Sequence, residues 1–226
     1  MTADLEALAQ EAAEIIVSAG AVYTRTSGDP FFFSSGWASP IFIDIKRLIS
    51  LPQARSRLIE ISIAVIQKRV GFETFELVAG CELAGVPYAA VIADRLRLPL
   101  VLVRKQGKGF GRLAQFEGAF EPEVRALLVD DLSTDGVNKQ TFRSAMERAQ
   151  ATVVATFVML DYRVFSGSGA LVSVMTLDHV IARGEESGFL SGQRLKEVKA
   201  FAADAAGWSR RNGGIGALDR SAPPAQ

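Results

Sequence analysis

Hydrophobic and polar positions along the chain predict strands and helices that follow one another in turn. Residues 4–18 are predicted to form an amphipathic helix, because apolar residues recur there close to the helical period. Pro52 opens a second helix at its first turn, and this helix runs to about Val70. Beyond it the pattern predicts, in order, strand 76–80, helix 85–97, strand 99–103, strand 125–130, helix 137–149, strand 152–160, strand 171–175, helix 177–186 and helix 191–206. Such alternation is typical of an α/β fold with a mainly parallel sheet flanked by helices.

The segment between the first two helices has a different pattern. Residues 31–44 read as two extended segments joined by a Ser/Gly turn. We expect a small N-terminal hood, formed mainly by residues 20–50, on a single domain that spans residues 1–226. The tail 221–226 has two prolines and no bulky apolar residue, so we expect it to fray.

Composition narrows the classes of function. The 226 residues are 49% apolar, which is enough for a full core. The net charge is zero, so the chain lacks the positive charge expected of a nucleic-acid binder. No apolar run approaches the roughly 18 residues of a membrane helix, and acids interrupt the first stretch, so we expect neither a membrane span nor a signal peptide. The single cysteine, Cys81, fits a reducing cytoplasm. Because the chain also has only one histidine, His179, no Cys/His metal cage is possible.

Residues 125–138 carry the clearest chemical signal. An apolar strand runs into Asp130 and Asp131 and then into a short polar turn around Gly136. Carboxylates at the end of a buried strand can hold ribose hydroxyls, while the turn and the following helix start offer backbone N–H groups to a phosphate. The alternative is a parallel strand followed by an ordinary polar loop.

Two further segments suit a phosphorylated ligand. Residues 104–112 hold four cations and three glycines without an acid, which fits a mobile loop that closes over a polyanion such as pyrophosphate, or a solvated charged loop. Residues 79–87 are a strand end and a glycine-bracketed turn before a helix, which is either a loop whose glycines allow close backbone approach or a plain turn.

Together with the segment 31–44, these pieces resemble the orotate phosphoribosyltransferase family of type I phosphoribosyltransferases. The family's hood segment, pyrophosphate loop, mobile loop and ribose-phosphate loop are matched in order and spacing over residues 31–140. The C-terminal run Trp208 to Gly214 is similar to the tail of some bacterial members.

The resemblance implies displacement of pyrophosphate from C1 of phosphoribosyl pyrophosphate by a ring nitrogen of orotate, in pyrimidine synthesis. It implies Lys108, Asp130 and Asp131 as catalytic residues. It also implies a homodimer, because in many members the mobile loop reaches the neighbouring subunit, and Mg²⁺ carried by the substrate without a protein metal site. The residues implied to bind phosphoribosyl pyrophosphate are Leu83, Ala84, Arg104, Lys105, Lys108, Asp130, Asp131, Ser133, Thr134, Asp135, Gly136, Val137 and Asn138.

The family match also places residues around orotate. Ser34, Phe42 and Ile43 would lie along the base, and Thr134 would touch it from the opposite side. Phe42 could equally be a core residue. Arg163 resembles the arginine of a family Asp-Arg pair, displaced by one residue.

Three departures leave other functions open. Phe110 stands where the family has histidine in the mobile loop, and Val137 where glycine or threonine is usual. Asp135 stands where a small residue should face the 5′-phosphate, and at about 5 Å such a charge opposes another by roughly 3 kcal/mol. Weak binding follows unless Asp135 turns away, protonates or is neutralised by Lys139. The alternatives are a non-catalytic or regulatory paralogue, or a phosphoribosyltransferase for another base.

Overall fold

The computed structural model describes residues 4–107, 110–112, 114–165 and 171–217. Its central sheet has six strands in the order β10-β9-β8-β5-β6-β7, and every neighbouring pair is parallel except β6 with β7. The strands are β5 (Leu77–Cys81), β6 (Leu100–Val103), β7 (Phe116–Glu117), β8 (Arg125–Ser133), β9 (Thr152–Asp161) and β10 (Val172–Thr176). The predicted α/β class is confirmed.

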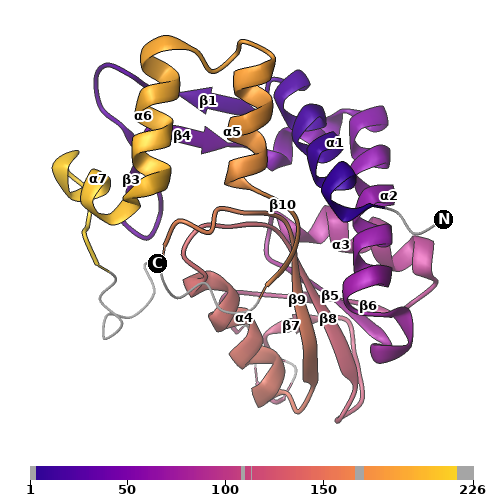
Figure 1. The fold of residues 1–226 in the computed structure, drawn as a ribbon. Coiled ribbons are helices and arrows are strands. Elements are labelled where there is room, and N and C mark those ends of the chain that lie inside the picture. Colours follow the sequence, from indigo (N-terminus) through magenta and orange to yellow (C-terminus); the bar gives the residue numbers. More distant parts are fainter. Residues whose placement is uncertain (1–3, 108–109, 113, 166–170, 218–226) are drawn as a thin grey trace.

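Helices cover both faces of this sheet (Figure 1). On one face lie α1 (Leu5–Ser18), α2 (Pro52–Arg69) and α3 (Gly85–Leu96), and on the other lies α4 (Val137–Arg148). Two short 3₁₀ helices, η1 (Ile45–Ser50) and η2 (Phe72–Thr74), flank α2. The chain continues through α5 (Leu177–Glu186), α6 (Gly192–Ala203) and α7 (Ala205–Arg211). Among the described residues, no helix is long and apolar enough to cross a membrane.

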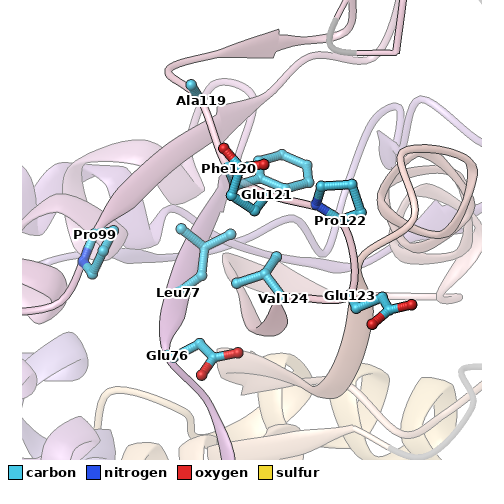
Figure 2. A pocket seen from close by; sticks show the side chains of 9 residues that line it. All are labelled: Glu76, Leu77, Pro99, Ala119, Phe120, Glu121, Pro122, Glu123 and Val124. Carbon is cyan, nitrogen blue, oxygen red and sulfur yellow. The ribbon is translucent and has the colours of Figure 1, made fainter.

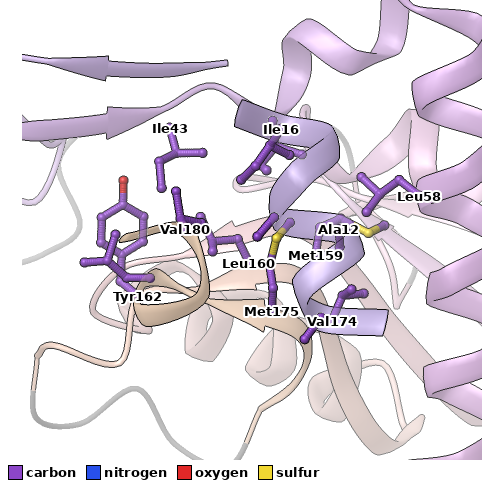
Figure 3. Close-up of a cluster of buried hydrophobic side chains, with 14 of the residues drawn as sticks. Ala12, Ile16, Ile43, Leu58, Met159, Leu160, Tyr162, Val174, Met175 and Val180 are labelled. Atoms are coloured by element: carbon purple, nitrogen blue, oxygen red, sulfur yellow. The ribbon is translucent and has the colours of Figure 1, made fainter. Parts of the chain in front are cut away.

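The main core lies between the sheet and the helices α1, α2 and α5. Figure 3 shows Ile16 of α1, Leu58 of α2 and Val180 of α5 around Met159 and Leu160 of β9, all of them buried. Because β8 and β9 are central strands covered on both faces, they read as nearly continuous apolar runs, which is the pattern expected of buried parallel strands.

The hood combines segments from both halves of the chain. Strand β1 (Val22–Thr24) pairs antiparallel with β4 (Ile41–Ile43), and β2 (Phe31–Phe32) pairs antiparallel with β3 (Ala38–Ser39), which confirms the two predicted extended segments. The N–H of Ala38 donates to the Ser209 hydroxyl of α7 over 2.9 Å. Residues 205–215 therefore complete a hood that the sequence placed mainly in residues 20–50.

Several boundaries differ from the predictions. Strand β8 continues to Ser133 instead of ending at residue 130, because Leu132 and Ser133 keep pairing with β9. The predicted helix 191–206 is broken at Asp204, whose carboxylate accepts from the N–H of Gly207 and caps α7. The short strands β1 and β7 were not predicted, and the tail 221–226 lies outside the described residues.

Candidate active site

The carboxyl ends of β5, β8 and β9 meet at one edge of the sheet, where open α/β sheets bind their ligands. Asp130 and Asp131 lie near the carboxyl end of β8, and successive strand residues point to opposite faces. Asp130 therefore faces α4, and Asp131 faces the side of α3 and the hood. Both carboxylates are buried, with 5% and 7% of their residue surface exposed.

Asp130 forms a buried ion pair with Lys139. The Nζ atom of Lys139 lies 2.5 Å from Oδ2 of Asp130, and both side chains are at most 10% exposed. Burial by itself lowers the pKa of Lys139, but the neighbouring Asp130 reverses this and the net pKa is raised. Oδ1 of Asp130 accepts from the N–H of Asp131 over 2.9 Å. Both oxygens of Asp130 are thus engaged by protein donors.

Asp131 has a different environment. Its Oδ1 accepts from the N–H of Leu132 over 2.8 Å, and no donor within the described part of the chain contacts its Oδ2. Burial, and then the charge of Asp130, raise the pKa of Asp131 to about 7, whereas Lys139 opposes this rise. Folding thus holds a carboxyl group that titrates near neutral pH at the end of β8.

The pyrophosphate-loop candidates Leu83 and Ala84 directly precede α3. Leu83 is 77% exposed, and the Glu82–Leu83 peptide bond is cis. Gly85, the first residue of α3, is required by close approach to β8: an added Cβ would lie 2.5 Å from the carbonyl oxygen of Val129. The loop therefore lies directly beside the acid pair.

The predicted phosphate loop continues from β8 into α4. Thr134 is half-buried, and Gly136 turns the chain with φ of +79°. The Ser133 hydroxyl is buried and has no hydrogen-bond partner among the residues that the structure describes. Val137 and Asn138 form the first turn of α4, where Val137 is 37% exposed.

Asp135 turns inward at this helix start. Its residue is only 4% exposed, its Oδ1 accepts from the N–H of Val137 over 3.1 Å, and its Oδ2 is buried. Of the three alternatives drawn from the sequence, this geometry favours a carboxylate that turns away from an incoming phosphate. Lys139 does not neutralise it, because its ammonium pairs with Asp130.

The cations of the predicted mobile loop, residues 104–112, have unequal environments. The guanidinium of Arg104 pairs with Glu117. Arg112 donates to the carbonyls of Ala149 and Phe120 over 2.8 and 2.6 Å, so it anchors the loop to the domain. Lys105 is exposed. Its backbone N–H donates to the carboxylate of Glu82, its carbonyl accepts from the side-chain amide of Gln115, and no acceptor within the described residues contacts its ammonium. Phe110 is fully exposed, and Lys108 lies outside the described residues.

Aromatic contacts join the hood to the acid pair. The ring of Phe33 lies 5.7 Å from that of Tyr162, and the N–H of Tyr162 donates to the carbonyl of Ser133 over 2.9 Å. Burial raises the pKa of Tyr162, and the charge of Asp131 adds to this rise. A hydrogen bond with the backbone of Ile43 partly offsets it. Tyr162 therefore lies between the hood and the acid pair, a role that the sequence did not indicate.

The predicted base contacts are distributed differently. Ser34 is exposed in the β2–β3 turn. Phe42 packs on Phe31 with ring centroids 5.6 Å apart, and it points away from the core side that Ile43 occupies. The guanidinium of Arg163 contacts Asp161 and Ser173 and lines a small groove beside α1. These contacts do not bring Arg163 toward the hood strands, so they lend its predicted role no support.

A cavity of 390 Å³ lies at the opposite edge of the sheet, near the amino ends of β5, β6 and β8 (Figure 2). Leu77, Phe120 and Val124 form its apolar wall, and Glu76 and Glu121 lie at its rim. It contains none of the predicted site residues.

Known proteins settle the family. No protein-family model matches the chain. The orotate phosphoribosyltransferase of Sinorhizobium fredii is 37% identical to it over 223 residues, covering 95% of this chain and 96% of that protein. The chain belongs to the orotate phosphoribosyltransferase family. A second member, from Roseobacter denitrificans, is 37% identical over 217 residues and is covered to 96%.

Solved structures agree with this family. The orotate phosphoribosyltransferase of Aeropyrum pernix superposes with a TM-score of 0.64 at 28% identity, covering 78% of this chain and 99% of that one. The Leishmania donovani UMP synthase has the same fold over 86% of this chain, with a TM-score of 0.72 at 23% identity, and the match spans 42% of that longer protein. The type I phosphoribosyltransferase fold predicted from the sequence is confirmed.

Proposed function

We propose that this chain transfers the phosphoribosyl group of phosphoribosyl pyrophosphate to orotate, giving orotidine 5′-monophosphate in pyrimidine biosynthesis. Its membership of the orotate phosphoribosyltransferase family supports this assignment. The single observation that carries it is the carboxylate of Asp131, which has one oxygen without a protein donor among the described residues, at the strand end beside both phosphate-loop candidates.

In the proposed reaction a ring nitrogen of orotate forms a bond to C1 of the ribose while the bond from C1 to the pyrophosphate oxygen breaks. Positive charge grows on the sugar and negative charge on the leaving group. Asp131 would hold the ribose hydroxyls, and the N-terminus of α4 would offer N–H groups to the 5′-phosphate. Lys105 and Lys108 would meet the pyrophosphate.

Magnesium fits this site as an ion that arrives with the substrate. The described part of the chain holds no group of three His, Cys, Asp or Glu side chains that could bind a metal ion together. Mg²⁺ often keeps several waters and binds through one or two carboxylates plus substrate phosphates. When bound, it would neutralise charge on the leaving pyrophosphate.

We also propose that the protein acts as a homodimer in which the loop 104–118 of one subunit reaches the site of the other. The solvent exposure of the Lys105 and Phe110 side chains supports this arrangement.

The decisive experiment is an assay of orotidine 5′-monophosphate formation from orotate and phosphoribosyl pyrophosphate with Mg²⁺. We expect turnover by the unmodified protein and none by Asp131→Asn, with equal circular dichroism spectra. Binding of phosphoribosyl pyrophosphate without turnover would point to a non-catalytic paralogue. Turnover with another base alone would point to a different acceptor.

A further inference from the structure

Lys139 lies on the buried face of α4, which is otherwise apolar. Phe142, Ala145 and Met146 share this face and pack into the core, whereas Lys139 directs its ammonium to the end of β8. Lysine is almost never fully buried without a partner, and here the partner is the Oδ2 atom of Asp130 at 2.5 Å. The pair places a compensating positive charge under the acid pair.

The contacts around the acid pair separate its two carboxylates. Asp130 receives Lys139 on one oxygen and the N–H of Asp131 on the other, and Gly85 lies so close that an added Cβ would be 2.8 Å from its Oδ1. Within the described residues, Asp131 receives only the N–H of Leu132, on Oδ1. An incoming hydroxyl therefore finds an available acceptor on Asp131 and a crowded, neutralised one on Asp130.

We propose that Lys139 is a positioning residue which neutralises Asp130 and thereby keeps Asp131 as the ionised carboxylate that receives the ribose hydroxyls. This inference rests on the proposed function, which it deepens by dividing the roles of the two acids.

The charged and titratable groups facing Asp131 set the direction of the effect. Asp130 comes from its own strand. The others are Lys139 from α4, Lys46 from η1, Tyr88 from α3, Cys81 from β5 and Tyr162, which directly follows β9. Burial and Asp130 raise the pKa of Asp131 to about 7, while Lys139 and Lys46 lower it. Without Lys139, Asp131 would hold its proton to a higher pH and lose an acceptor oxygen at neutral pH.

The test is the pH dependence of kcat/KM for phosphoribosyl pyrophosphate in four proteins: wild type, Lys139→Met, Asp130→Asn and the double variant. We expect the acid limb of the profile to move upward by about one pH unit in Lys139→Met, at the low end of the shift that a nearby charge produces. It should move downward in Asp130→Asn and return close to the wild-type position in the double variant. Arg148→Met, which removes one positive charge from the exposed end of the same helix, should leave the limb in place.

The outcomes separate the alternatives. A limb that stays in place in both single variants would overturn the proposal and leave the pair a purely structural role. A pH-independent rise in the KM of Lys139→Met that persists in the double variant would also overturn the proposal, because Lys139 would then bind a phosphate directly. If Lys139→Met does not fold, the comparison of Asp130→Asn with the double variant gives the same answer, since loss of Lys139 should again move the limb upward.

A second readout does not depend on turnover. The carboxyl carbon of Asp131, labelled with ¹³C and assigned from the Asp131→Asn variant, reports its own titration by NMR in the absence of substrate. We expect its midpoint to rise by about one unit in Lys139→Met relative to wild type and Arg148→Met. If the midpoint rises but the protein forms no orotidine 5′-monophosphate, the proposed function is wrong and the role of Lys139 stands. If the enzyme is active but the midpoint does not move, the proposed function stands and the role of Lys139 is wrong.

Discussion

Asp131 is a residue that folding pushes toward its protonated form, because the folded chain buries it beside a second carboxylate. Its pKa rises from an unfolded value of 3.8 to about 7. The folded state therefore binds the proton more tightly, so the contribution of this group to stability is greatest below the unfolded pKa and is lost as pH rises through the folded pKa. An ionised Asp131 at this site therefore lowers the stability of the folded protein at neutral pH.

We predict that Asp131→Asn raises the free energy of unfolding while it abolishes transfer. Asparagine cannot ionise yet still accepts the Leu132 N–H, so the gain should reach up to about 4 kcal/mol near pH 8 and fall to less than half of that near pH 5. Urea unfolding curves at the two pH values measure it. A variant less stable than wild type near pH 8 would contradict the argument.

Asp135 shows how a charge that conflicts with a phosphate in the sequence is accommodated in the structure. Its carboxylate accepts from the N–H of Val137 at the start of α4 and has one oxygen buried, so it does not face an open cradle. The sequence alone shows that Asp135 brings a negative charge to the loop. It does not show where the Asp135 side chain points, because that direction depends on the turn at Gly136, which the local pattern does not specify.

We therefore predict that Asp135→Asn leaves the KM for phosphoribosyl pyrophosphate within about threefold of wild type, because the charge lies away from the phosphate. The amide keeps the acceptor for Val137, but loss of the charge at the helix N-terminus should lower stability by about 0.5–1 kcal/mol. Steady-state kinetics and denaturation measure the two effects. A tenfold fall in KM would show that the carboxylate opposes the phosphate after all.

At the scale of elements, periodicity is enough to predict helices and strands, but long-range pairing decides where they end. Helices α1, α2 and α5 follow their predicted ranges closely. Strand β8 extends beyond its predicted end because β9 supplies hydrogen-bond partners for its polar end. Asp130 and Asp131 therefore lie inside the strand. The buried Lys139 falls at helical spacing with Phe142 and Met146, a signal that the sequence contains but that has meaning only once Asp130 lies opposite.

The cation-rich loop 104–112 allows a prediction at this scale, because its cations are not equivalent. Lys105→Met should raise the KM for phosphoribosyl pyrophosphate by about tenfold or more and weaken its dependence on salt, since an exposed charge that meets pyrophosphate is lost. Arg112→Met should leave KM near wild type and lower stability by about 1 kcal/mol, since its guanidinium serves two backbone carbonyls. Kinetics at two ionic strengths, with thermal unfolding, check both. Equal effects of the two variants on KM would refute this division of roles.

At the scale of the whole molecule, the hood is held together by residues far apart in the chain. Trp37 stacks on Phe165 with ring centroids 4.3 Å apart, and the N–H of Ile215 donates to the carbonyl of Gly36 over 3.0 Å. Local pattern predicts the two extended hood segments. It does not show that a C-terminal segment packs against them, because no periodicity connects residues separated by most of the chain.

The proposed dimer gives the last prediction, which asks whether each site uses a loop from the neighbouring subunit. Asp131→Asn removes the carboxylate proposed to hold the ribose and leaves the loop intact, whereas Lys108→Ala removes a loop cation and leaves the carboxylate intact. Each variant alone should be nearly inactive. If the loop acts in the partner's site, a mixed dimer contains one doubly impaired site and one intact site.

Random reassortment of equal amounts makes half of the dimers mixed, so the mixture should recover about a quarter of wild-type activity. Dissociation and refolding of the two variants together, followed by the transfer assay, measures the recovery, and each variant refolded alone is the control. A loop that acts in its own subunit would restore nothing, because each site in the mixed dimer would then keep one defect. Sedimentation of the unmodified protein as a monomer at micromolar concentration would rule out the arrangement from the start.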